Sequence, residues 1–286
     1  IHKFPKKIFW EIKKIEIYSE KSEKENLLRF ENNKNNLFYI IKNNELYLSL
    51  MKKASKNKYF KKKIIKNKSF FENLHKKKYD LIINCDSNNF LSNKFFSKKI
   101  NKSYDNLAYT TILKHKKIKN HIATQIFTKK GPIAFLPISN NETSVVYSLD
   151  IKNRKYSDRE VLELISKNNP KYQIEKMLKL SSFKLSASNL RNYYHENILA
   201  FGDLLHRIHP LAGQGFNMTI RDIKILSEII QKKIDLGIQL DSSILYDFEK
   251  ETKNKNFLFS NSIDLIYEIF NFDKQKKNKS LNNILK

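Results

Sequence analysis

The sequence predicts an α/β (α+β) fold, in which parallel strands followed by helices share one chain of 286 residues with an antiparallel sheet. A compact apolar run at 81–83 ends in polar residues that favour a turn, which indicates a buried parallel strand. A second short strand, ENILAF at 196–201, leads directly into a glycine-containing loop and a helix. Four strand patterns between Leu107 and Asp150, separated by the hairpin sequences TKKGP and SNNE, predict the antiparallel sheet.

Residues 1–60 contain three strand patterns and one ambiguous segment. The strand patterns are FWEIKKIEIYS, LLRF and LFYII. In ELYLSLMKKASKN the leucines alternate as in a strand, whereas Tyr47, Met51 and Ala54 repeat at the spacing of a helix. The length of the segment and the lysines at its end favour a helix.

Helices dominate the second half of the pattern. The capping-box sequence SDRE at 157–160 predicts the start of one helix, and Pro170 suits the first turn of another. A further helix is expected to begin near Phe216 and to end before Gly237. Periodic apolar residues predict a last helix over 243–270.

The composition is that of a globular protein. Hydrophobic residues make up 40% and aromatic residues 12% of the chain, which is too much apolar material for a disordered protein. The single cysteine, Cys85, excludes an internal disulfide and fits a reducing cytosol. No apolar run reaches the roughly 18 residues needed to span a bilayer. We therefore expect a cytoplasmic protein that associates with the inner membrane only peripherally.

The net charge of +26 raises the question of a nucleic-acid partner. The lysines are spread along the chain among asparagines and isoleucines, and few arginines are present for bidentate contacts with guanine or phosphate. We therefore expect no nucleic-acid partner and a weaker attraction to anionic lipid surfaces. A basic protein that binds nucleic acid or a membrane surface without any chemistry is the alternative of another functional class.

The candidate chemistry is concentrated in GDLLHRIHPLAGQGFNMTIRD, residues 202–222, which holds three of the five glycines. Asp203 follows a strand and can accept hydrogen bonds from ribitol or ribose hydroxyls. Gly213 and Gly215 have no Cβ, so the backbone can approach a flat ring closely. The start of the next helix favours negative charge on that ring. The segment therefore suits a cofactor with a polyol and an electron-rich ring, such as a flavin.

This segment closely resembles the second flavin motif of FAD-dependent aromatic hydroxylases, and its HPLAGQGFN…RD wording is most similar to the ubiquinone-biosynthesis hydroxylases. DLIINCDSNN at 80–89 resembles the middle motif of the family, a strand that ends in Asp-Gly. KKGPIAFLPI at 129–138 resembles the sheet segment usually worded GPLALLPL. The three stretches follow the order of the family and span nearly the whole chain.

The resemblance implies an FAD-binding Rossmann-like layer combined with an antiparallel substrate-binding sheet. The expected domains are 1–104, the remainder of the FAD-binding domain; 105–182, the substrate domain; and 183–286, the C-terminal part of the FAD-binding domain. The implied enzyme is an FAD-dependent monooxygenase that uses NAD(P)H and O2 to hydroxylate the aromatic ring of a ubiquinone precursor, a prenylated phenol. The implied associations are with a quinone-biosynthesis complex and a membrane surface.

The resemblance also assigns roles to individual residues. Asp203, after Gly202, would bind the ribitol chain. Pro210 would lie beside the flavin near the substrate, which makes it the candidate for a catalytic positioning role. Asp86 would lie near the pyrophosphate or the substrate passage. The residues expected to line the pyrimidine end of the isoalloxazine are Gly213, Gln214, Gly215, Phe216 and Asn217.

The sequence departs from the family in three places. Ser87 and Thr219 stand where glycines are usual, and Ser87 would distort the middle turn if that turn required a positive φ. The opening βαβ unit with GxGxxG has no counterpart among these residues. We therefore expect an N-terminally incomplete sequence, weak FAD binding by this chain, and an exposed strand edge around 81–83.

Simpler interpretations stand beside these roles. No cluster of Cys, Asp or His joins His206 and His209, so we expect no metal and local hydrogen bonds instead. Asp86 suits a cap at a strand end as well as a functional role. Cys85 follows an apolar strand and fits a buried small residue better than a nucleophile. A related flavin reductase, or an inactive member of the family, is the alternative function within the flavin class.

Overall fold

The computed structural model divides the chain into two compact units. The residues that it describes are 5, 8–20, 27–32, 35–65, 70, 74, 79–152, 154–208 and 213–275. One unit comprises residues 1–62, 105–184 and 276–286, and the other comprises 63–104 and 185–275. β6 (Lys99–His115) and β11 (Ser181–Leu190) each begin in one unit and end in the other. The two units differ in their bounds from the three expected domains, 1–104, 105–182 and 183–286. The assignment of those domains to cofactor and substrate stays a prediction.

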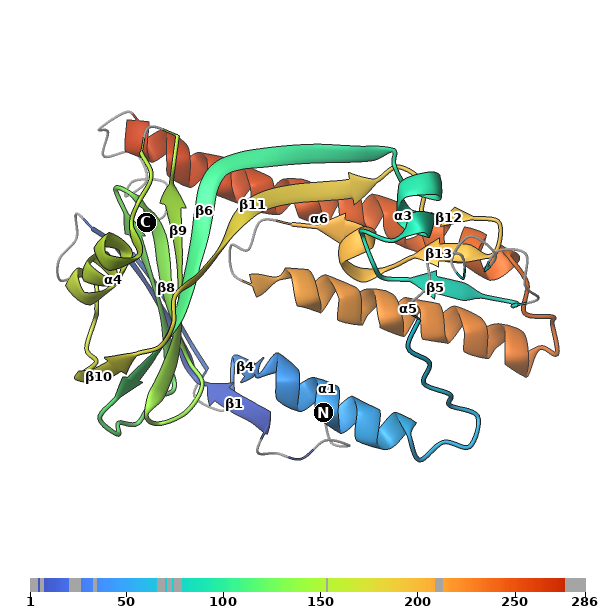
Figure 1. The fold of residues 1–286 in the computed structure, drawn as a ribbon, viewed down its shortest axis with the longest axis horizontal. Helices are drawn as coiled ribbons and strands as arrows, with labels where there is room; N and C mark the ends of the chain where they lie inside the picture. Colours follow the sequence, from blue (N-terminus) through green and yellow to red (C-terminus); the bar gives the residue numbers. More distant parts are fainter. Residues whose placement is uncertain are drawn as a thin grey trace. The chain divides into compact units, whose positions relative to one another are not determined.

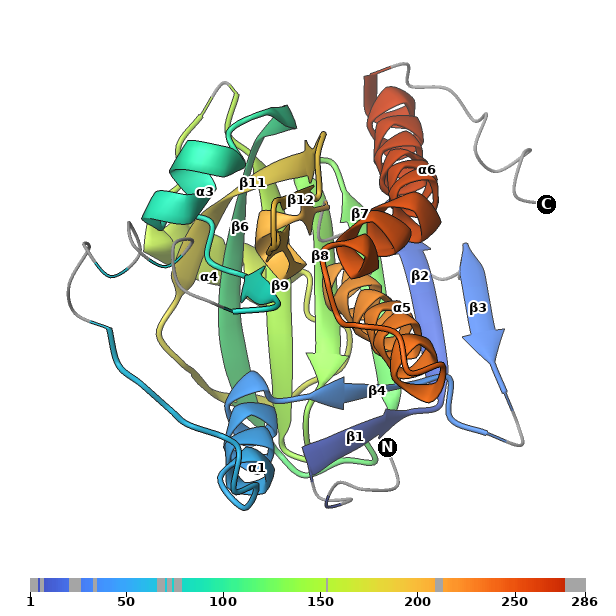
Figure 2. The ribbon, with the colours of Figure 1, turned by 90° about the vertical axis from the view of Figure 1, so that its right-hand side faces the viewer.

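The first unit is built on a largely antiparallel sheet. Its strands lie in the order β6, β9, β8, β7, β2, β3 (Figure 2). β10 pairs with β6. Only β2 and β7 pair in parallel. The bounds are β2 Lys14–Ser19, β3 Leu28–Glu31, β7 Ile122–Thr128, β8 Gly131–Pro137, β9 Glu142–Asp150 and β10 Ile174–Met177. The antiparallel sheet expected from the four strand patterns is confirmed.

One face of this sheet forms the core of the unit. Residues of β8 alternate between buried and half-buried, so Ile133 and Phe135 lie in the core while Ala134 and Leu136 lie on the other face. α4 (Asp158–Lys167) covers the core face with Val161 and other apolar residues. Its capping box is present as predicted: the Ser157 side chain accepts the amide of Glu160, and the Glu160 side chain accepts the amide of Ser157.

A glycine is required in the hairpin between β7 and β8. Gly131 has φ +143°, and a Cβ at this position would lie 1.7 Å from the carbonyl oxygen of Ser148. The conformation and the close approach of β9 both exclude a side chain. Gly131, the first residue of GPIAFLPI, is therefore required by the packing of β8 against β9.

The N-terminal strand pattern differs from the prediction in its connectivity. FWEIKKIEIYS forms two strands in different sheets, because β1 (Phe9–Ile12) pairs with β4 (Phe38–Ile41) whereas β2 pairs with β3 and β7. The ambiguous segment is a helix, α1 (Asn43–Ala54), as its lysines suggested. α1 has no buried residue.

The second unit combines a small sheet with helices (Figure 1). Its sheet has the order β12, β13, β5, in which β13 is antiparallel to β12 and parallel to β5. The bounds are β5 Ile82–Asn84, α3 Phe90–Phe95, β12 Tyr194–His195, β13 Ile198–Ala200, η2 Gly202–Leu204, β14 His206–Arg207, α5 Gly215–Asp235 and α6 Ser243–Gln275. Ile198 and Leu199 of β13 share one apolar cluster with Leu226 of α5 and Phe248 of α6. Together the two units confirm the predicted α/β (α+β) class.

Two local expectations have clear outcomes. No helix begins at Pro170, because Asn169 closes a side-chain turn instead: its Oδ1 accepts the amide of Tyr172 at 2.9 Å, and its Nδ2 donates to the Tyr172 carbonyl at 2.6 Å. The strand edge at β5 is exposed, since β5 pairs only with β13 among the described residues and Ile83 is 46% exposed.

Candidate functional site

Parallel pairing of β5 and β13 brings two sequence motifs to one edge of the sheet. Ala200 is in register with Asn84, and the amide of Phe201 donates to the Asn84 carbonyl at 2.9 Å, so the ladder continues to the ends of both strands. The residues after the strands, Asp86 and Asp203, therefore leave the sheet at the same carboxyl edge. In open α/β sheets this edge is where ligands bind.

Cys85 follows β5, and its pKa depends on the charge of Asp203, which follows β13. Cys85 is exposed at the residue level, which corrects the expectation of a buried small residue, because β5 ends at Asn84 and Cys85 lies just outside the strand. Desolvation of the thiol by surrounding protein atoms raises the pKa of Cys85, and the negative charge of Asp203 raises it further. The charge of the Asp203 carboxylate therefore affects the ionisation of the Cys85 thiol, although the two residues follow different strands.

Asp203 is displayed by a turn whose other residues are anchored. Gly202 is buried with φ +60°, a conformation that suits glycine, and Leu204 and Leu205 are both buried. The Leu205 carbonyl also accepts the amide of Leu190 at 3.0 Å. The Asp203 side chain itself is exposed, and no protein hydrogen bond engages its carboxylate within the described residues. The carboxylate is therefore available to accept hydrogen bonds from a ligand.

The start of α5 leaves its first amides without a cap. Gln214 at the N-cap makes no side-chain cap hydrogen bond, and the first turn contains no acidic residue. The Gln214 side chain instead accepts Asn217 Nδ2 at 3.0 Å. Because the Gln214 side chain does not cap them, the first amides and the dipole of this 21-residue helix favour a negatively charged or electron-rich ligand.

Gly213 and Gly215 differ in whether the backbone conformation requires a glycine. Gly213 has φ +64°, so a side chain there would be strained although the space around it is open. Gly215 is not held by such a constraint, because a Cβ would meet only Ile208 Cγ1 at an ordinary 3.8 Å. Packing among the described residues does not require a glycine at 215, and close approach of a ligand there stays a prediction.

The middle motif uses side-chain turns where the family has glycine. Asp86 accepts the amide of Asn88 at 2.8 Å, and Asn89 caps α3 by accepting the amide of Ser92 at 2.9 Å. Ser87 does not have a positive φ, so the distortion considered for it does not occur. Asp86 thus has the capping role, and its place near a pyrophosphate or substrate stays a prediction.

A buried polar cluster lies at the ends of the glycine loop. His206 Nε2 lies 2.5 Å from Asp222 Oδ2, with side chains 1% and 0% exposed. Asn256 of α6 donates to both Asp222 oxygens at 3.4 and 3.5 Å, and its Oδ1 accepts Arg221 NH2 at 2.6 Å. His206 makes the local hydrogen bond expected of it. The role of Asp222, which lies on the buried face of α5 with Met218 and Ile225, was not predicted from the sequence. Its helical spacing from these two apolar residues is the signal that could have found it.

Residues 98–235 match the protein-family model described as FAD binding domain. The match includes β13, the turn with Asp203, and all of α5. This part of the chain is therefore similar to FAD binding domains. The resemblance found in the glycine segment is therefore confirmed, and FAD is the cofactor that this family implies.

Curated relatives come from ubiquinone biosynthesis. The chain is 27% identical over 183 residues to the ubiquinone biosynthesis monooxygenase COQ6 of Dictyostelium discoideum, a match that covers 51% of this chain and 37% of the relative. It is 30% identical over 152 residues to the 3-demethoxyubiquinol 3-hydroxylase of Escherichia coli, covering 51% and 39%. The matches therefore span less than half the length of these relatives.

The fold is similar to that of a solved structure, PqsL, a probable FAD-dependent monooxygenase from Pseudomonas aeruginosa. The TM-score is 0.68, and the similarity covers 97% of this chain and 82% of that one at 13% identity. At this identity the similarity supports the fold class.

The remaining candidate residues have less structural support. Pro210 and His209 lie outside the described residues. Phe216 and Asn217 are exposed on the first turn of α5, and Gln214 is half-buried beside them. Thr219, at a position where the family has glycine, places its hydroxyl 3.5 Å from the Gly215 carbonyl.

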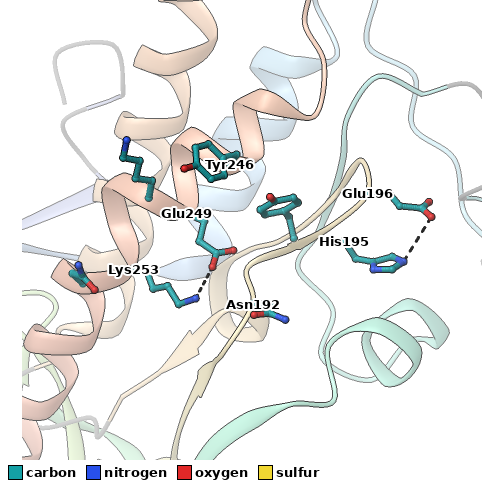
Figure 3. A pocket seen from close by; sticks show the side chains of 9 residues that line it. Asn192, His195, Glu196, Tyr246, Glu249 and Lys253 are labelled. Carbon is teal, nitrogen blue, oxygen red and sulfur yellow. Dashed lines mark hydrogen bonds and ion pairs between the residues drawn. The ribbon is translucent and has the colours of Figure 1, made fainter.

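A cavity of about 600 Å³ lies elsewhere in the second unit (Figure 3). It is lined by the β12–β13 hairpin and α6, and Glu249 Oε1 pairs there with Lys253 Nζ at 2.5 Å. The lining residues of the hairpin, 192–196, come before β13, so the cavity adjoins the amino end of that strand, whereas Asp203 follows its carboxyl end. The cavity is therefore separate from the candidate cofactor edge.

Two further observations concern other classes of site. Across the described ranges, no three His, Cys, Asp or Glu side chains gather closely enough to hold a metal ion. In the same ranges, no helix combines the length and apolar character needed to cross a bilayer.

The proximity of the two strand ends predicts the reactivity of Cys85. Asp203→Asn removes a negative charge, so the pKa of the thiol should fall while staying above its ordinary value, because desolvation is the larger cause. The thiolate is the reactive form, so alkylation at pH 8 should become about twofold faster. Iodoacetamide labelling measures this directly because the chain has one cysteine. Asp241→Asn is the matched control, and equal rates in both variants would contradict the geometry.

Proposed function

We propose that this chain forms part of an FAD-dependent monooxygenase that hydroxylates the aromatic ring of a ubiquinone precursor, with NAD(P)H as reductant and O2 as oxygen source. The observation that carries the proposal is the edge where one short segment holds two features: the Asp203 carboxylate, which has no hydrogen-bond partner in the described part of the chain, and the start of α5, which Gln214 does not cap. The similarity to enzymes of ubiquinone biosynthesis supports the choice of a phenolic precursor of ubiquinone as substrate.

The residues present fit FAD. Asp203 would accept hydrogen bonds from the ribitol hydroxyls, and Gly202 allows the turn that exposes it. The first-turn amides of α5, reached across Gly213 and Gly215, would face the electron-rich pyrimidine end of the ring. Pro210 is proposed to position the flavin relative to the substrate.

When bound, FAD supplies the transfer of electrons from NAD(P)H to O2, while the protein supplies binding and orientation. In the first unit, the face of β8 with Ala134 and Leu136 is opposite the α4-covered core, and Ala134 is in register with Val146 of β9. We propose that this apolar face receives the prenylated phenol, because substrate sites are mostly apolar with few polar groups.

Asp203→Ala should weaken FAD binding by about tenfold or more, because ligand hydroxyls would lose a charged acceptor. Quenching of flavin fluorescence during titration of the whole chain with FAD measures the dissociation constant. Asp241→Ala, which removes another exposed carboxylate of the second unit, is the control. The same affinity in wild type, Asp203→Ala and Asp241→Ala would refute the assigned role of Asp203.

Product analysis distinguishes hydroxylation from the reductase alternative. Transfer of ¹⁸O from labelled O2 to a prenylated phenol by the flavin-loaded protein supports the monooxygenase. Oxidation of NAD(P)H that yields only hydrogen peroxide supports a related reductase instead.

We also propose that the enzyme binds peripherally to anionic membranes and to a quinone-biosynthesis complex. The end of α1 and the residues that follow it support the membrane part, because 52–62 holds six lysines in eleven residues together with Tyr59, which is 80% exposed, and Phe60. Lysines attract an anionic surface and aromatic rings suit its interface. The absence of buried residues on α1 leaves this part of the first unit open to such contact.

Replacing Lys56, Lys58 and Lys61 by glutamate should reduce binding to vesicles that contain phosphatidylserine by about tenfold or more at low salt. Cosedimentation measures the bound fraction. The matched control replaces Lys116, Lys117 and Lys119, which are also exposed lysines of the first unit. Equal losses in both variants would mean that net charge alone drives binding, and no loss in either would reject the membrane proposal.

A further inference from the structure

The buried residues His206 and Asp222 flank Gly213 and Gly215 in the sequence. His206 lies in β14 before the loop, and Asp222 lies in α5 after it. The separation of 2.5 Å between Nε2 and Oδ2 joins the two ends of 207–221 through side chains that are almost completely buried. The segment between them contains Gly213 and the uncapped first turn of α5.

The surroundings of Asp222 fix the α5 side of this connection. Asn256 is 0% exposed and lies within hydrogen-bond distance of both carboxylate oxygens, so α6 also holds Asp222 in place. The Arg221 guanidinium bonds to Asn256 and lies 5.5 Å from the centre of the Phe259 ring. Burial is the main cause that raises the pKa of nearby Tyr193 to about 12, and the negative charge of Asp222 adds to it.

The His206 side of the pair is incompletely satisfied. Its Nδ1 is buried and has no hydrogen-bond partner within the described residues, and Arg221 Nε is in the same condition. Apolar residues of similar size would avoid the cost of burying these unmatched polar atoms. A buried polar group that is retained at such a cost calls for a reason other than packing.

We propose that His206 and Asp222 are positioning residues for the flavin loop, an inference that rests on the proposed function. Their hydrogen bond links β14 to α5, so that Gly213 and the first amides of α5 keep their place relative to Asp203, which lies three residues before His206. Neither side chain is proposed to touch substrate. Each acts through the backbone that presents the cofactor contacts.

The test compares His206→Leu, which removes the hydrogen bond, with His206→Gln, whose side-chain amide can still donate to Asp222. In flavin-free protein, hydrogen exchange of the amides at 213–218 should become about tenfold faster or more in His206→Leu and stay within about threefold of wild type in His206→Gln, since a hydrogen bond to a charged group is lost only in the first. The dissociation constant for FAD and the flavin absorption spectrum should change in the same order.

His115→Leu is the matched control for loss of a buried histidine. His115 is 1% exposed and lies in the first unit, with Nε2 at 3.0 Å from Thr143 Oγ1. It should reduce stability without changing exchange at 213–218. If His206→Leu does not fold, Asp222→Asn replaces it, because the hydrogen bond then loses its charged acceptor.

The outcomes separate the inference from the proposed function. Unchanged exchange at 213–218 in His206→Leu, or an equal change in His115→Leu, overturns the positioning role. Faster exchange limited to the His206 variant, in a chain whose wild type shows no binding of FAD at millimolar concentration, supports the positioning role and contradicts the proposed cofactor site.

Discussion

The parallel hydrogen bonding of β13 to β5 is the constraint on which the candidate site depends. The two strands have three residues each, and their pairing alone would be marginal in water. Burial completes it, because Ile198, Leu199 and Ala200 are all 0% exposed against residues of α5 and α6. Consecutive residues of a strand point to opposite faces, so both faces of β13 are buried. The apolar cluster therefore holds β13 in place, and its register with β5 fixes where Asp86 and Asp203 leave the sheet.

Several features of 202–222 lower stability locally, and they occur close together. Gly202 and Gly213 have positive φ, the N-cap of α5 lacks a side-chain hydrogen bond, and His206 Nδ1 is buried without a described partner. Each could be replaced by a more stable local solution: a helix cap alone typically contributes about 1 kcal/mol. Such clusters of locally unfavourable features are typical of functional sites. This clustering supports a binding role for the segment independently of its similarity to known motifs.

Sequence patterns predicted the elements better than their connections. The capping box at Ser157, the start of α5 near Phe216 and the last helix from 243 follow from local signals, and all are present. The split of FWEIKKIEIYS between two sheets depends on distant partner strands, which periodicity does not encode. Likewise Pro170 suited a helix start locally, but hydrogen bonds from Asn169 formed a turn.

The candidate site shows the same division. Strand–loop–helix order predicted Asp203 at a strand end and amides at a helix start, since both are properties of one continuous segment. The partnership of His206 with Asp222 and Asn256 involves three separate elements, and it required the packed structure. For Asp86 the sequence allowed two roles, a cap at a strand end and a functional role. The structure shows the side-chain turn with Asn88.

The central claim is that the carboxyl edge of β5 and β13, with the start of α5, is the flavin site. Titration of the ¹⁵N-labelled chain with FAD up to millimolar concentration, followed by amide chemical shifts, tests it most directly and also detects weak binding. The account predicts concentration-dependent shifts at Gly202, Asp203 and Gly213 to Asn217. Shifts confined to the cavity residues of the β12–β13 hairpin and α6, from Asn192 to Asn254, would contradict it, as would an unchanged spectrum.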